Sequence, residues 1–132
     1  MFALIEIRTY EMGKDKVFLV TGGTAHIGAS ATAYWAANGE ACVEVVSVPG
    51  HRERELAVEL AIVAASTLRR TVAVLIGIHL DRPTKQEISD VVEEARRKLQ
   101  ELLMRACARP NRRHGEEDGC LMSRPGTWNG QG

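Results

Sequence analysis

The stretch TVAVLIGIH, residues 71–79, decides the fold that this sequence predicts. It is a continuous apolar run of strand length, whereas a strand with one face in water alternates apolar and polar residues. We therefore expect a central strand that is covered on both faces. The segments on either side of it have helical patterns, so helices are expected to pack on the sheet that contains this strand.

The helix before this strand is predicted over residues 52–68. Its charge is concentrated near its start, and beyond Leu60 it is almost entirely apolar, so its second half should be buried. The helix after the strand begins at a capping box, in which Thr84 and Glu87 each satisfy a backbone N–H of the other. Apolar residues at three- and four-residue spacing over 88–106 predict an amphipathic helix of about five or six turns.

The N-terminal half is predicted to form strands joined by tight turns. Asn38-Gly39 favours a hairpin because both residues readily adopt positive φ. The fold class is therefore α+β: a four-stranded antiparallel meander, then a helix, a fifth strand and a long C-terminal helix packed on the sheet. The four strands are expected at residues 2–10, 16–21, 26–35 and 41–48.

Charge and composition exclude several classes of partner. Seventeen Lys+Arg balance seventeen Asp+Glu, so the chain has no net positive charge to attract nucleic acid or an anionic membrane. No apolar run approaches a membrane span, and residues 1–8 lack the basic start of a signal peptide, so we expect a cytoplasmic protein. The three cysteines show no CxxC spacing, which disfavours a structural zinc site.

The chain divides into two parts by composition. Residues 1–107 carry the apolar runs and form the predicted domain. Residues 108–132 are rich in Gly, Pro and charge, with too few apolar side chains to fold alone, so we expect a flexible tail.

Topology places the unusual residues together. The second strand ends and the third begins around residues 21–28, the fourth ends at 48–51, and a fifth strand parallel to the fourth ends at 77–81. These three segments should meet at one edge of the sheet, which we call the rim. The rim would hold His26, His51 and His79 together with the predicted helix starts.

Such a rim suits either of two roles. Helix N-termini carry unpaired N–H groups and partial positive charge, and histidine donates hydrogen bonds, so an anionic or polar ligand would fit there. A protein-docking surface is the alternative. Glu53 and Glu55 are expected to be solvated acids that complement the helix dipole.

An enzyme is the third alternative. His26, His51 and His79 could together hold a zinc ion with one position open to water, as a small metal-assisted hydrolase or isomerase would require. No HxH or HExxH pair supports this, and no GxSxG elbow marks a nucleophile. We therefore predict no metal ligands and no catalytic residues, and expect a non-catalytic protein.

Three separated segments resemble the LpdD-like domain, a small accessory protein associated with UbiD-type hydroxyarylic acid decarboxylases. They are GGTAHIGA (22–29), VPGHRERELA (48–57) and GIHLD with TKQEI (77–81 and 84–88), and the similarity covers roughly residues 2–104. The resemblance implies a chaperone that helps to load or maintain prenylated flavin, with a fold similar to proteasome-assembly chaperones.

The resemblance also implies site residues and partners. It points to Gly22, Gly23, His26, Gly28, His51, Glu55 and His79. A flavin phosphate at the first helix N-terminus would be held by the backbone of Gly50, His51 and Arg52. We therefore expect no intrinsic cofactor but transient prenylated flavin mononucleotide (FMN), a UbiD-type decarboxylase as partner, and a homodimer, because the sheet leaves free edges.

Overall fold

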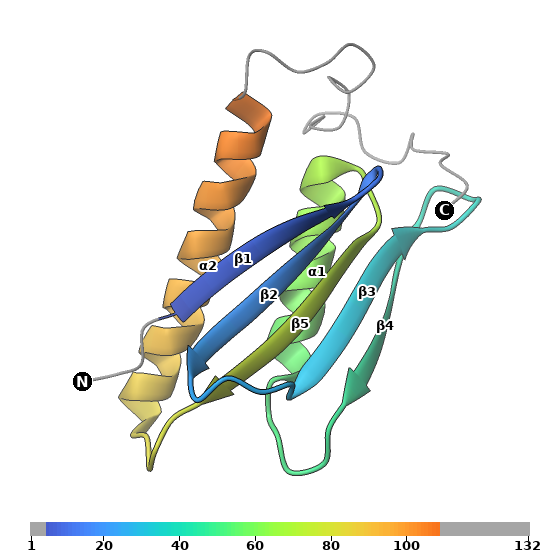
Figure 1. The fold of residues 1–132 in the computed structure, drawn as a ribbon. Helices are drawn as coiled ribbons and strands as arrows, with labels where there is room; N and C mark the ends of the chain where they lie inside the picture. The colour runs from blue at the N-terminus through green and yellow to red at the C-terminus, as the bar shows by residue number, and fades with distance from the viewer. Residues whose placement is uncertain (1–4, 109–132) are drawn as a thin grey trace.

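The computed structural model describes residues 5–108, which form one mixed sheet with two helices on one of its faces (Figure 1). The expected tail, apart from Ala108 at the end of the last helix, lies outside the described residues. In chain order the elements are β1 (Ile5–Met12), β2 (Asp15–Gly23), β3 (Ala29–Trp35), β4 (Ala41–Ser47), α1 (Arg54–Leu68), β5 (Val72–His79) and α2 (Lys85–Ala108).

The α+β class and the order of the elements are as predicted, but the strand pairing differs from a meander. The sheet order is β1-β2-β5-β3-β4. β5 therefore lies between β2 and β3, parallel to the first and antiparallel to the second. Neighbouring strands are about 4.8 Å apart, so the connection over residues 24–28 has only to span about 10 Å to leave room for β5. The apolar run at 71–79 is thus the central strand, as expected.

The helices cover only one face of the sheet, where the core lies (Figure 1). α1 packs on β3, β4 and β5, while α2 packs on β1 and on α1. Phe18, Val74 and Ile76 point into this core and are fully buried. Leu19 and Leu75 point to the other face and are only half-buried, so the expectation that β5 is covered on both faces is wrong.

Small residues allow α1 to lie close to the sheet. Alanine recurs on its inner face, and the buried set is Ala57, Ala61, Ala64 and Ala65. α1 starts at Arg54, slightly later than predicted, because residues 52 and 53 belong to the preceding connection.

α2 begins at the predicted capping box. The Glu87 N–H donates to Thr84 Oγ1 at 3.0 Å, and the Thr84 N–H donates to Glu87 Oε1 at 2.9 Å. Its buried stripe is spaced by four residues and consists of Val91, Ala95, Leu99 and Leu103. In the part of the chain described, no helix is long and apolar enough to cross a membrane.

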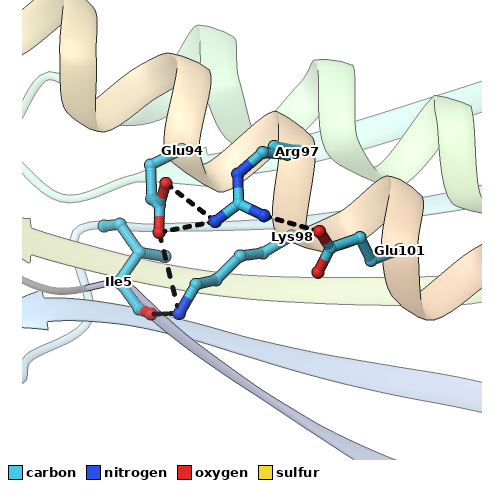
Figure 2. Close-up of polar contacts among 5 residues, drawn as sticks. All are labelled: Ile5, Glu94, Arg97, Lys98 and Glu101. Atoms are coloured by element: carbon cyan, nitrogen blue, oxygen red, sulfur yellow. Dashed lines mark hydrogen bonds and ion pairs between the residues drawn. The ribbon is translucent and has the colours of Figure 1, made fainter.

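A cluster of charged side chains connects α2 to β1 (Figure 2). Lys98 Nζ donates to the backbone oxygen of Ile5 at 2.7 Å and lies 3.8 Å from Glu94 Oε2. Arg97 pairs with Glu94 on one side and with Glu101 on the other, and both carboxylates raise the pKa of the Arg97 guanidinium, Glu94 chiefly by accepting its hydrogen bond. We call Glu94, Arg97, Lys98 and Glu101 the α2 charge cluster.

Candidate functional site

Four strand ends meet at the rim, as the sequence predicts. β2, β4 and β5 run in the same direction and end there, and β3 starts there. The His26 ring centroid lies 4.8 Å from that of His51 and 6.3 Å from that of His79. His26 and His51 lie in two separate connections and His79 is the last residue of β5, so histidines from three distant segments gather in one place.

The connection between β2 and β3 crosses the end of β5 in close contact. The Gly28 N–H donates to the Ile76 carbonyl at 2.8 Å. A Cβ on Gly77 would lie 1.8 Å from the backbone oxygen of His26, a distance no real Cβ adopts. Glycine at position 77 thus lets the backbone of His26 lie directly on β5, and this contact positions the imidazole.

A tight turn brings His51 to the same place. The His51 N–H donates to the Val48 carbonyl at 3.2 Å, and Gly50 between them has a φ of 86°. Proline at the second position and a positive-φ glycine at the third are typical of a type II turn. The Val48 N–H in turn donates to the Gly28 carbonyl at 2.9 Å, which ties the turn to the β2–β3 connection.

Glu53 lies at the centre of these segments, contrary to the expectation that it is solvated. Only 9% of its side chain is exposed. Its Oε2 accepts the Ile78 N–H at 3.0 Å and lies 3.2 Å from His26 Nε2. Its Oε1 is buried, has no hydrogen-bond partner among the described residues, and is 4.0 Å from His51 Nδ1. We call His26, His51 and Glu53 the rim cluster.

Gly28 makes the space that the Glu53 carboxylate occupies. A Cβ at position 28 would lie 2.4 Å from Glu53 Oε1. Sequence reasoning missed Glu53, although one signal was available: the N-cap position of a helix usually holds Ser, Thr, Asp or Asn. A glutamate there, whose side chain makes no capping hydrogen bond, serves another contact.

The remaining predicted residues lie outside the rim cluster. Gly22 is buried within β2, where a Cβ would lie 2.8 Å from Ile5 Cδ1, so its role is in packing rather than in a loop. Gly23 ends β2 with a φ of 71°. Gly50, Arg52 and Glu55 are exposed, and Glu55 has the solvated position expected of it.

Among residues 5–108, the geometry identifies one group of side chains that could hold a cation. Ligand atoms of His26, His51 and Glu53 all lie within 4.8 Å of one another. The zinc site considered in the sequence analysis consisted of His26, His51 and His79 instead. In the structure the third member of the group is Glu53 and not His79.

The fold and the rim together define a small α+β protein with a recessed carboxylate under two partly exposed histidines. This chain belongs to the family of the prenylated flavin chaperone LpdD-like domain, whose model matches residues 3–107. The resemblance carried by the three rim segments is thereby confirmed, and the family supports a chaperone role connected with prenylated flavin. No curated protein matches the chain.

Proposed function

We propose that this protein binds reduced prenylated FMN at the rim and transfers it to a UbiD-type decarboxylase. The observation that carries the proposal is a difference between its two helix N-termini. The N-terminus of α2 is closed by the Thr84–Glu87 capping box. The N-terminus of α1 has no side-chain cap, because Glu53 turns away from it toward Ile78.

The first N–H groups of α1 are therefore left for an acceptor from outside the helix. A phosphate suits this position, since the helix dipole and the unpaired N–H groups both favour an anion. Exposed His51 and Arg52 stand just before the helix and add hydrogen-bond donors. The isoalloxazine part would then extend over the rim toward His26 and His79.

Flavin titration tests this proposal. The full chain would be titrated anaerobically with reduced prenylated FMN and with riboflavin, which lacks the phosphate, and binding would be followed by fluorescence and calorimetry. We expect the phosphate-bearing flavin to bind at least about tenfold more tightly, and Arg52→Gln with His51→Ala to remove that preference. Lys85→Gln, at the capped N-terminus of α2, is the matched control. Equal, negligible binding of both flavins by the wild-type protein would overturn the proposal.

Delivery is tested separately from binding. Apo-decarboxylase of the UbiD type would be mixed with the flavin-loaded protein, and its activity compared with that after adding the same amount of free cofactor. We expect faster or more complete activation from the loaded protein. Free cofactor that activates equally well would contradict the delivery step while leaving flavin binding intact.

We also propose that the face of the sheet away from the helices receives a second copy of the chain. A row of paired residues across this face includes Leu19, Leu75 and Val46, and Val46 is 67% exposed. Apolar groups in the middle of a sheet face that none of the described helices covers favour a protein partner. Leu75→Glu should convert the dimer to a monomer in sedimentation experiments. A wild-type protein that sediments as a monomer at high concentration would contradict this.

A further inference from the structure

We infer that His26, His51 and Glu53 form a binding site for one divalent transition-metal ion. The inference goes beyond the proposed flavin role and does not rest on it. It starts from the carboxylate of Glu53, which is nine-tenths buried and has one oxygen, Oε1, without a hydrogen-bond partner among the described residues. A buried unsatisfied carboxylate oxygen costs free energy of folding, and a bound cation would remove that cost.

The hydrogen bonds of His26 point to the same conclusion. Its Nδ1 lies 3.0 Å from the Thr24 carbonyl and its Nε2 lies 3.2 Å from Glu53 Oε2, and both partners are acceptors. A neutral imidazole has a single ring proton and can donate to only one of them. When that proton is on Nδ1, a metal ion beside Nε2 supplies the positive charge that the second contact needs.

The arrangement of His26 is the one that metal-bound histidines adopt. In metalloproteins the ring nitrogen that does not bind the metal commonly donates to a backbone carbonyl, which orients the ring and selects its tautomer. Thr24 provides that carbonyl. The Nε2 lone pair is thereby directed toward the Glu53 carboxylate and the space beside it.

The distances within the rim cluster suit a shared ion. A metal bound at about 2.1 Å to each of two atoms holds them no more than about 4.2 Å apart. Glu53 Oε2 and His26 Nε2 are 3.2 Å apart, and Glu53 Oε1 and His51 Nδ1 are 4.0 Å apart. Each of the two histidines is thus within bridging distance of a carboxylate oxygen. The three ligand atoms together lie within 4.8 Å of one another, so a single shared ion requires the exposed His51 ring to move inward by about 0.6 Å.

The donor set determines the class of metal. Two imidazoles and one carboxylate favour Zn²⁺, Co²⁺ or Fe²⁺ over Mg²⁺ and Ca²⁺, which prefer oxygen ligands. Exposed fractions of 23% for His26 and 35% for His51 leave the outer side of the site open to solvent. The ion would therefore retain coordination positions for water or for a ligand that arrives at the rim.

The test is metal titration of the full chain in the absence of flavin. After treatment with a chelator, the protein would be titrated with Zn²⁺ in a calorimeter and with Co²⁺ followed by its visible absorption. We expect one ion per chain, with a Co²⁺ spectrum that lacks thiolate charge-transfer bands. Glu53→Gln, which keeps an oxygen for the Ile78 N–H, should weaken binding by at least about 100-fold, because even second-shell changes cost about 10- to 100-fold.

Two kinds of variant make the result decisive. His51→Asn changes an exposed turn and leaves the core intact, so it should also weaken binding if the site is correct. Glu55→Gln, which changes an exposed glutamate in the first turn of α1, and His114→Asn, which changes the fourth histidine of the sequence, should leave binding unchanged. Absence of Zn²⁺ and Co²⁺ binding in the wild-type protein, or binding that survives both Glu53→Gln and His51→Asn, would overturn the inference.

Discussion

The rim cluster and the α2 charge cluster both connect a helix to a strand through charged side chains, yet they differ in how fully their groups are paired. In the α2 charge cluster each acid faces a base, and Arg97 and Glu101 are about half exposed. In the rim cluster Glu53 is buried beside two histidines and one of its oxygens has no hydrogen-bond partner among the described residues. The charged groups of the first cluster are all paired, whereas one carboxylate oxygen of the second has no hydrogen-bond partner among the described residues.

This difference distinguishes the charge that only stabilises the domain from the charge that we propose to be functional. Exposed ion pairs contribute little to stability because water screens them and the side chains lose entropy. A buried carboxylate oxygen that lacks a hydrogen-bond partner lowers the free energy of unfolding, and such groups are often found at sites of binding or catalysis. The variants below are arranged by the size of the effect that this comparison predicts.

The largest effect is expected at the glycine on which the rim is built. In Gly77→Ala the new Cβ would collide with the backbone oxygen of His26, which cannot rotate away, so we expect a loss of about 3 kcal/mol or more in the free energy of unfolding. Urea denaturation measures it. Gly13→Ala is the control, because a Cβ at position 13 would meet no other atom within 4 Å. Its only cost is that of placing alanine at a φ of 63°, which should lower the free energy of unfolding by about 1 kcal/mol. Similar costs for both would show that the rim tolerates movement of the β2–β3 connection.

The next effect concerns Glu53 itself in the metal-free protein. Glu53→Leu leaves the Ile78 N–H without an acceptor and should lower the free energy of unfolding by about 2 kcal/mol. Glu53→Gln retains that acceptor and should cost less than about 1 kcal/mol. Thermal and urea unfolding of both variants check the difference. A leucine variant as stable as the wild type would mean that the hydrogen bond to Ile78 contributes nothing.

A smaller effect is expected in the α2 charge cluster. Lys98→Met keeps the aliphatic stem but loses the charge-assisted hydrogen bond to the Ile5 carbonyl, which should cost about 1 kcal/mol. Arg97→Met removes two exposed ion pairs and should leave stability unchanged within the error of urea denaturation. If Arg97→Met were the more damaging change, exposed pairing would matter more here than contact with the strand.

The smallest effect is a change in one titration. The Tyr34 hydroxyl donates to Glu44 Oε2 at 3.1 Å, and this hydrogen bond, reinforced by the negative charge of the carboxylate, raises the pKa of Tyr34. Both causes favour the neutral phenol, so Glu44→Gln should make Tyr34 ionise at lower pH, with no change in fold. Ultraviolet absorbance of tyrosinate follows the titration, with Tyr10→Phe removing the other tyrosine. An unshifted curve would show that the pair does not persist in solution.

Local signals predicted the elements well, and pairing between distant segments was predicted less well. The central strand at 71–79 and the capping box at Thr84 follow from short stretches of sequence. The insertion of β5 between β2 and β3 could not be read from turns, because turn residues do not report which strands become neighbours. The gathering of the histidines was still predicted correctly, because it depends on the direction of the strands and not on their order.

The rim was predicted from sequence, but its central group was not. Whether an acid near a helix start is exposed depends on what surrounds it in the fold. For Glu53, the absence of a side chain at Gly28 leaves the space in which the carboxylate is buried. Gly28 belongs to a different connection, which the local pattern around Glu53 does not reveal. Glu55, two residues further on, matched the local expectation because nothing packs over it in the same way.

The position of β5 has a consequence for the order in which the molecule is completed. β1 with β2 and β3 with β4 are pairs close in sequence, so each can form early, but no hydrogen bonds join the two pairs until β5 lies between them. Contacts between distant segments require the closure of a long loop, and the entropy cost of that closure slows their formation. The same strand supplies the Ile78 N–H to Glu53 and the glycine beneath His26. We therefore expect the protein to acquire its polar site in the step that closes its sheet, and a chain that still lacks β5 to be without the site that we propose.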